Sequence, residues 1–178
     1  MFEGKKVNLR VAANEGFPPF EERLSNLEFS REPSPFRQMS KSKTERILED
    51  PYEMKSYAIE KKDGTKVGLI FHFHVLHPAY EQLEVGYNLA PSERGKGYCA
   101  EAMKLVVDHL FQSGDTMRVQ ACTAVTNLAS RKVLEKAGFK KERKMRKYVF
   151  FRGKLRDVYY YRILRQDWKK PRILTRAS

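Results

Sequence analysis

The chain has 178 residues, of which 41% are hydrophobic and 32% are charged, and its formal net charge at pH 7 is +13. This size and balance are typical of a single soluble globular domain, and they exclude a fibrous, disordered or membrane-spanning protein. The first residues lack an apolar signal core, and two cysteines are too few for a disulfide framework, so we expect a cytoplasmic protein with reduced thiols.

Almost all of the excess positive charge lies near the C-terminus. Residues 140–178 contain fifteen lysines and arginines and three acidic residues, so residues 1–139 are close to neutral. Such a region attracts polyanions, for example a phosphorylated cofactor, an acidic protein or nucleic acid, whereas a solvated basic edge is the simpler alternative. We expect one domain over residues 1–170, followed by a basic C-terminal tail over residues 171–178.

The first half of the chain is predicted to consist mainly of strands. Asp63-Gly64 is typical of a hairpin turn between two of them, because glycine readily adopts positive φ. Pro18, Pro19, Pro33 and Pro35 interrupt residues 14–54 and leave short helical pieces around 21–29 and 44–49. Alternation of polar and apolar residues predicts strands over residues 6–11, 57–61, 67–76 and 83–89.

The second half alternates helices and strands. Apolar residues at helical spacing predict helices over 97–113 and 128–137, the second closed by Gly138. The remaining segments, 117–123, the stretch from 139 onward and 158–164, are predicted strands, the last two paired across 152–154. This order of elements describes one mixed α/β domain built on a single sheet.

The clearest chemical signal lies in the loop before the first predicted helix. The backbone N–H groups at a helix start are unpaired and lie at the positive end of the helix dipole, which suits a pyrophosphate. Glycines allow phosphates to approach closely, and neighbouring bases add positive charge. The spacing fits neither a Walker loop nor a dinucleotide fingerprint, and a plain tight turn is the alternative. The loop reads Arg94-Gly95-Lys96-Gly97-Tyr98-Cys99-Ala100.

Two motifs resemble those of the GNAT superfamily of N-acetyltransferases, and their residues are most similar to those of its RimJ/RimL branch. Arg-x-x-Gly-x-(Gly/Ala) between a strand and a long helix resembles the family's pyrophosphate loop. Asn127 to Ser130, followed by a short helix and Gly138-Phe139, resembles its later coenzyme A segment. The resemblance implies a GNAT-like α/β fold, with a central, mostly antiparallel sheet of about six to seven strands flanked by about four helices.

The resemblance also implies roles for individual residues. Asn127 would hydrogen-bond acetyl-CoA near its thioester, and Ser130 would lie close to the sulfur. Many members protonate the departing thiolate with a tyrosine that is Leu134 here, so Ser130 is the expected proton donor. Cys99 replaces a Gly or Ala of the loop and introduces a thiol open to oxidation or alkylation. The backbone of Val85, Gly86 and Tyr87 would run beside the pantetheine arm, and Arg94, Gly95, Lys96, Gly97, Tyr98, Cys99 and Ala100 would hold the pyrophosphate.

Acetyl transfer to an amine needs a base, because a lysine or N-terminal amine is largely protonated at pH 7. Glu84 is the predicted base, since it lies on the strand that would pass the thioester; a solvated strand carboxylate is the alternative. The next candidates are His72, His74 and His77. No cysteine or carboxylate completes a ligand set with them, so we predict no metal site.

The sequence therefore predicts an acetyl-CoA-dependent N-acetyltransferase that works by direct attack in a ternary complex. The acceptor would be a protein N-terminus or, second, a small amine. The basic C-terminal region suits an acidic protein or docking near RNA or the ribosome, and disfavours polyamines. Asp157 would contact the acceptor amine or pair with Arg156 or Arg152. The alternative is a non-catalytic coenzyme-A- or RNA-binding module with the same fold, and either a monomer or a homodimer is compatible with the sequence.

Overall fold

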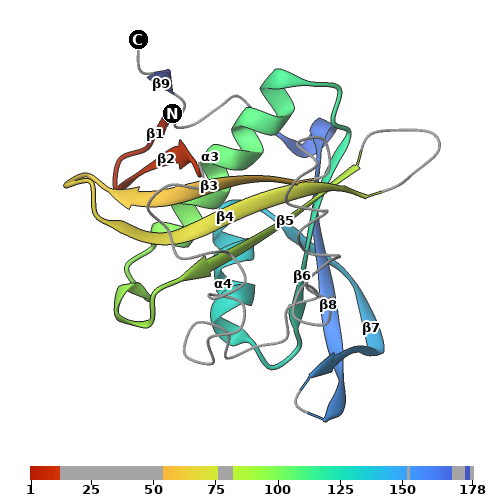
Figure 1. Cartoon of the computed structure of the whole chain (residues 1–178). Helices are drawn as coiled ribbons and strands as arrows, with labels where there is room; N and C mark the ends of the chain where they lie inside the picture. Colours follow the sequence, from red (N-terminus) through yellow and green to blue (C-terminus); the bar gives the residue numbers. More distant parts are fainter. Residues whose placement is uncertain (13–53, 76–81, 152, 170–174, 177–178) are drawn as a thin grey trace.

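The computed structural model describes residues 1–12, 54–75, 82–151, 153–169 and 175–176 (Figure 1). The predicted helical pieces between residues 14 and 54 lie outside this part. In chain order the described elements are β1 (Phe2–Glu3), β2 (Val7–Val11), β3 (Met54–Lys61), β4 (Lys66–Val75), β5 (Gln82–Leu89), the 3-10 helix η2 (Pro91–Glu93), α3 (Tyr98–Ser113), β6 (Arg118–Ala124), α4 (Leu128–Ala137), β7 (Lys140–Phe151), β8 (Lys154–Leu164), the 3-10 helix η3 (Arg165–Asp167) and β9 (Thr175–Arg176).

The strands of the described residues form one sheet of nine, in the order β7-β8-β6-β5-β4-β3-β2-β1-β9. Neighbours are antiparallel except β5 and β6, which confirms the predicted mixed α/β fold with a mostly antiparallel sheet. The predicted strand number of six to seven is wrong. The difference includes β1 and β9, which have two residues each and are too short to show an alternating pattern.

The β3–β4 turn and the end of α4 form where the sequence predicts them. Gly64 has a φ of 82° in the β3–β4 hairpin, and Asp63 Oδ1 accepts a hydrogen bond from the Thr65 N–H at 2.8 Å. Helix α4 has the predicted bounds and ends at Gly138, whose φ is 99°. Each of these glycines occupies a left-handed backbone region that other residues enter only with strain.

Helices α3 and α4 pack together on one face of the sheet. From α3, Ala102, Met103, Leu105 and Val106 are completely buried. Alternate residues of β5, among them Leu83 and Val85, belong to the same core. The residues between them leave β5 on the opposite face. None of the described helices has the length and apolar character that crossing a bilayer requires.

The parallel pair β5 and β6 divides the sheet. Only three pairs join these strands, and the last is Glu84 with Gln120. Beyond that point β5 continues beside β4, and β6 continues beside β8, and the two strands diverge (Figure 1). In the described structure, the backbone of β5 from Val85 to Leu89 therefore has no strand partner on its β6 side.

Candidate active site

The loop between β5 and α3 is an open helix N-terminus. Gly95 and Gly97 have φ values of 82° and 88°, and Gly97 is the N-cap of α3. The first helical bond runs from the Glu101 N–H to the Gly97 carbonyl at 3.2 Å, so the preceding N–H groups have no acceptor within the helix. Among described atoms, a Cβ at Gly95 would meet nothing within 4 Å, and one at Gly97 would meet the Lys6 Nζ at 3.4 Å. The glycines therefore permit the left-handed backbone angles and, because they lack a Cβ, leave space for a ligand to approach the loop.

Lys6 brings a positive charge to this loop from the start of the chain. Its Nζ donates to the carbonyl of Lys96 at 3.1 Å. Lys96 itself pairs with Glu93 at 2.9 Å, and the Arg94 Nε donates to the Leu89 carbonyl at 3.4 Å. Lys6 could not be assigned to the loop from the sequence, because it lies about ninety positions from the loop in the chain.

Glu101, in the first turn of α3, fixes Lys6 in place. Its carboxylate accepts hydrogen bonds from the backbone N–H of Lys5 and, at 3.0 Å, from that of Lys6. A Cβ at Gly4 would lie 2.5 Å from Glu101 Oε1, so only glycine allows this contact. A carboxylate here also interacts favourably with the helix dipole. Glu101 therefore ties the turn before β2 to the loop.

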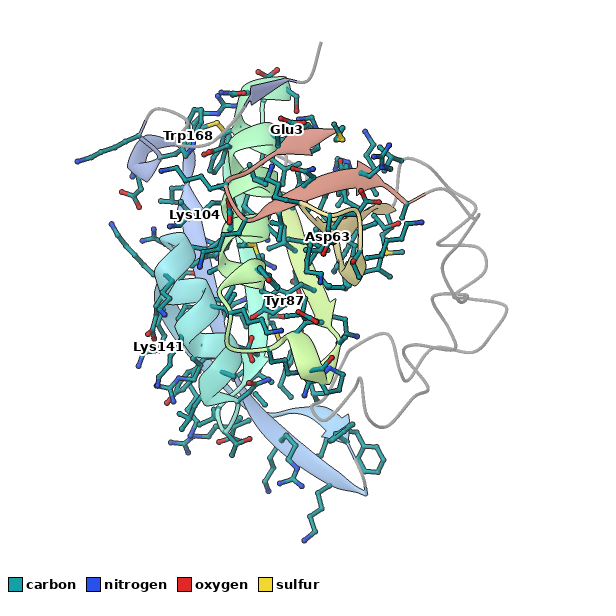
Figure 2. The ribbon with its side chains drawn as sticks, turned by 90° about the vertical axis from the view of Figure 1, so that its left-hand side faces the viewer. Glu3, Asp63, Tyr87, Lys104, Lys141 and Trp168 are labelled. Atoms are coloured by element: carbon teal, nitrogen blue, oxygen red, sulfur yellow. The ribbon has the colours of Figure 1, made fainter. Side chains whose placement is uncertain are left out.

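Tyr87 on β5 and Ser130 on α4 are in direct contact. The side chain of Tyr87 leaves β5 on the face covered by α3 and α4 (Figure 2). Its hydroxyl lies 2.8 Å from Ser130 Oγ and donates to the Ser130 carbonyl at 3.3 Å. Burial raises the pKa of Tyr87, so the hydroxyl keeps its proton at neutral pH. Only the Tyr87 backbone was expected at the site, since its side-chain contact depends on how α4 packs.

Asn127 begins α4. Its Oδ1 accepts a hydrogen bond from the Ser130 N–H at 2.9 Å, an N-cap bond. This bond sets the first turn of α4 and with it the place of the Ser130 hydroxyl. Asn127 and Ser130 thus lie together where the sequence placed them, at the end of the loop after β6.

Glu84 lies on the other face of β5, at the point where β5 and β6 part. Its Oε2 accepts a hydrogen bond from Gln120 Nε2 at 2.8 Å. Burial raises the pKa of Glu84, while the Gln120 hydrogen bond and the positive charge of Arg143 act in the opposite direction. The carboxylate is therefore partly buried and held, rather than freely solvated.

Side chains from β6, β7 and β8 complete the surroundings of Glu84. Burial, and secondarily Glu84, raises the pKa of Cys122 to about 12. The Tyr160 hydroxyl donates to that of Tyr148 at 3.1 Å, and the Arg143 guanidinium lies 4.8 Å from the centre of the Tyr160 ring. The sequence could not group these residues, because the pairing of four strands brings them together.

The family follows from a comparison with known proteins. Residues 6–140 match the family described as the acetyltransferase (GNAT) domain. The chain belongs to the GNAT acetyltransferase family. This finding confirms the resemblance and the fold inferred from the sequence.

The proteins to which this GNAT chain is similar have names that refer to different substrates. It is 34% identical over 107 residues to a putative ribosomal N-acetyltransferase, YdaF, of Bacillus subtilis (strain 168), over 60% of this chain and 58% of that protein. The match thus spans less than two thirds of that relative. The fold is similar to Mycobacterium smegmatis RimJ in complex with CoA-disulfide (TM-score 0.77, 21% identity, 96% of this chain, 90% of the other). It is also similar to a Vibrio cholerae spermidine N-acetyltransferase in complex with CoA and spermine (TM-score 0.73, 17% identity, 91% and 97%).

Two positions at which this GNAT chain departs from the family pattern are both buried. Leu134 is 1% exposed and belongs to the core, so it offers no proton donor. Burial raises the pKa of Cys99 to about 12, against the weaker effect of Arg94. Since the thiolate is the reactive form, we expect Cys99 to react slowly in the folded protein, unlike the thiol open to oxidation or alkylation that the loop sequence suggested.

The histidines lie away from Glu84. His72 and His74 stand opposite Val85 and Leu83 in the β4–β5 register, whereas Phe73 stands opposite Glu84. They therefore leave the sheet on the helix-covered face, which argues against either as the base beside Glu84. Burial lowers the pKa of His72 to about 4. His77 lies outside the described residues, within which no group of three or more His, Cys, Asp and Glu could hold a metal ion.

Asp157 contacts Lys144 and Lys147 in the described part of the chain, where no ion pair with Arg156 is seen, and Arg152 lies outside the described residues. The Asp157 Oδ2 lies 2.8 Å from the Lys144 Nζ, and its Oδ1 accepts from the Lys147 N–H at 2.9 Å. These bonds lower the pKa of Asp157. They hold Lys147 at a φ of 48°, in an irregular part of β7. Bulges of this kind redirect side chains, and Tyr148 follows directly.

Proposed function

We propose that this chain transfers an acetyl group from acetyl-CoA to an amine. The observation that carries the proposal is the parting of β5 and β6 directly after Glu84 and Gln120. In the described structure, the backbone of Val85, Gly86 and Tyr87 has no strand partner on the β6 side of β5. It can therefore form hydrogen bonds with an extended pantetheine arm, as it would with an added strand. The loop at the start of α3 follows the end of β5, and the first turn of α4 follows the end of β6, so both lie toward the end at which the two strands have parted.

The loop fits the phosphates of coenzyme A. Positive φ at Gly95 and Gly97 aims backbone N–H groups outward from the start of α3, and no described side chain blocks the approach. Lys6 adds a positive charge at the Lys96 carbonyl. We assign the pyrophosphate to residues 94–100 and the thioester end to Asn127 and Ser130.

Glu84 would serve as the base. It accepts a proton from the ammonium form of the acceptor, directly or through one water, and the neutral amine then attacks the thioester carbonyl carbon. A pKa raised by burial suits this role, because it brings the carboxylate closer to the operating pH.

Ser130 would serve as the proton donor on the opposite side of the reaction. When the carbon–sulfur bond breaks, the Ser130 hydroxyl donates a proton to the departing sulfur, and the nitrogen of the intermediate releases its second proton to solvent. Glu84 then returns its proton to solvent, and Ser130 regains one from solvent by way of the Tyr87 hydroxyl, 2.8 Å away, which ends the cycle protonated. The products are an N-acetylated amine and the free thiol of coenzyme A. No metal and no covalent enzyme intermediate take part in this scheme.

The favoured acceptor is a protein N-terminal amine, and a small amine is second. The name of the Bacillus relative supports the first. Charge supports it too, because the exposed Arg143 of β7 lies beside Tyr160 in the surroundings of Glu84 and acts on its carboxylate, and its positive charge would repel a polycation. The same strand could hold the enzyme near RNA or an acidic protein. We assign the fold and the whole proposed site to one domain over residues 1–170.

Calorimetric titration with acetyl-CoA, and then with coenzyme A, tests the proposal. We expect saturable one-to-one binding, followed by release of free thiol when a peptide with a free N-terminus is added. An N-terminally blocked peptide of the same sequence is the control, and spermidine tests the small-amine class. Binding without thiol release from any acceptor would favour the non-catalytic module, and no binding by folded protein would exclude the site.

A further inference from the structure

We propose that Gln120 is a positioning residue for the Glu84 carboxylate; this inference rests on the role of Glu84 in the proposed function. Gln120 stands opposite Glu84 in the last pair of β5 and β6. Its side chain belongs to a residue that is 4% exposed, and its Nε2 donates to Glu84 Oε2 at 2.8 Å. A buried amide needs partners at both ends, because unpaired buried polar groups are unfavourable.

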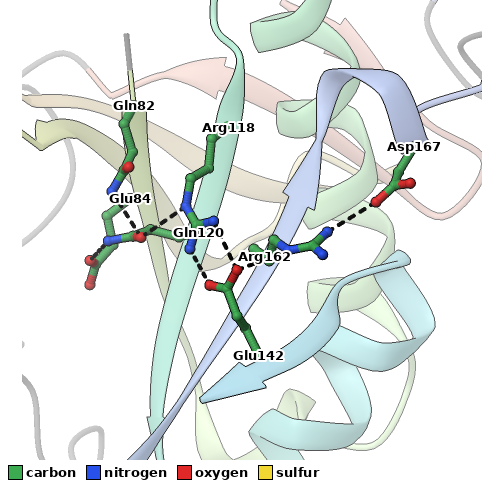
Figure 3. A network of polar contacts seen from close by, with 7 residues as sticks. All are labelled: Gln82, Glu84, Arg118, Gln120, Glu142, Arg162 and Asp167. Atoms are coloured by element: carbon green, nitrogen blue, oxygen red, sulfur yellow. Dashed lines mark hydrogen bonds and ion pairs between the residues drawn. The ribbon is translucent and has the colours of Figure 1, made fainter. Parts of the chain in front are cut away.

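Arg118 decides which end of the Gln120 amide faces Glu84. The two ends of an amide have nearly the same shape, so their partners determine the orientation. Gln82 donates to Gln120 Oε1 at 2.9 Å, but Gln82 could also turn its own amide. Arg118 cannot, since a guanidinium only donates, and its Nε lies 3.4 Å from the same oxygen. Oε1 must therefore face Arg118, and Nε2 is directed to Glu84 (Figure 3).

A series of ion pairs across β6, β7 and β8 fixes the position of the Arg118 side chain. Glu142 on β7 accepts from both terminal nitrogens of Arg118, Nη1 at 3.1 Å. Arg162 on β8 donates to Glu142 at 3.0 Å and to Asp167 at 3.0 Å (Figure 3). Arg118 cannot turn away from Gln120 without breaking its bidentate pair with Glu142. The orientation of Gln120 is thus built into four neighbouring strands.

The hydrogen bond from Gln120 favours the ionised form of Glu84 and fixes one of its two oxygens. Arg143 is the charged group that also stabilises it, while Cys122 and Tyr160 face it as neutral groups because burial raises their pKa values. With Oε2 bound to Gln120, Oε1 is the oxygen that receives the proton of the acceptor. Gln120 therefore sets both the basicity of Glu84 and its direction.

The test is a titration of the Glu84 carboxyl by nuclear magnetic resonance on protein labelled with 13C at the glutamate carboxyls. The signal is assigned by its absence in Glu84→Gln. We expect Gln120→Met, which keeps the side-chain length but cannot donate, to raise the titration midpoint of Glu84 by about one to two pH units. The matched control is Gln82→Met, which leaves Arg118 to orient Gln120 and should leave the midpoint nearly unchanged. An unchanged midpoint in folded Gln120→Met would overturn the inference.

A second measurement, on the parent protein, tests the inference even if Gln120→Met does not fold. The side-chain amide protons of Gln120 should shift with pH at the midpoint of Glu84, and this dependence should vanish in Glu84→Gln. Amide protons that ignore the Glu84 titration would also overturn the inference. Turnover separates it from the proposed function: full activity of Glu84→Gln would remove Glu84 as the base, while the titrations would still decide whether Gln120 controls the carboxylate.

Discussion

Replacing Gly97 by alanine should weaken acetyl-CoA binding, whereas the same change at Gly64 should not. The two positions are matched in backbone conformation, with φ values of 88° and 82°. A Cβ at Gly64 would meet nothing within 4 Å among described atoms, and one at Gly97 would meet only the flexible end of Lys6 at 3.4 Å. Both variants should therefore lose similar folding stability, about 1–2 kcal/mol for a left-handed non-glycine residue.

The difference between the variants should appear only with ligand. A Cβ at Gly97 would stand where a phosphate approaches the N–H groups of α3. We expect binding of acetyl-CoA to weaken at least about tenfold, equivalent to about 1.4 kcal/mol, while Gly64→Ala binds as the parent does. The larger change Gly97→Trp should abolish binding in a protein that still folds.

Calorimetry gives the dissociation constants, and thermal unfolding without ligand gives the stabilities. A loss of about 1–2 kcal/mol should lower the Tm of either variant by about 2–8 °C in a domain of this size. If Gly97→Ala bound acetyl-CoA as tightly as Gly64→Ala, or if Gly97→Trp bound it normally, the loop would be only a turn, and the assignment of the pyrophosphate would be wrong.

Three further predictions concern single side chains. Ser130→Ala should lower turnover by about 100-fold or more with little change in coenzyme A affinity, and Tyr87→Phe should act in the same direction; unchanged turnover in Ser130→Ala would remove it as the acid. Cys99 should be alkylated much more slowly in native than in unfolded protein at pH 7.5, because burial raises its pKa to about 12; equal rates measured by mass spectrometry would contradict this. The free energy of unfolding should fall as the pH drops from about 6.5 to about 4, by up to about 3 kcal/mol, because unfolded His72 takes up a proton in that range and folded His72, with its pKa lowered to about 4, does not. Denaturant titrations should show a weaker pH dependence in His72→Phe, and an identical slope would refute the assignment.

Features that depend on a few consecutive residues could be predicted from the sequence. Positive φ at Gly64, Gly97 and Gly138 is a local requirement, so the hairpin, the open start of α3 and the end of α4 could be located in advance. Alternating or helical spacing located the longer strands and both described α-helices. Asn127 and Ser130 lie within one short motif, and their mutual contact is also local.

Other features exist only because distant segments meet. The sequence placed His72 and His74 on one face of a strand, but the β4–β5 register decides that this face is the one away from Glu84. A shift of one residue would have reversed the result, since side chains alternate between faces. The two-residue strands β1 and β9 form because β1 pairs with the longer β2 and β9 then pairs with β1, and their own residues carry no periodic signal.

The site itself shows the same division. The sequence by itself determined a glycine loop before a helix, a carboxylate on the preceding strand and a serine at the next helix start. Tertiary structure added Lys6, the Tyr87 hydroxyl and Gln120, each joined to the site by a contact across at least 36 positions of the chain. Such contacts are set by packing and strand register rather than by neighbouring residues, because they form only when the sheet and helices are assembled.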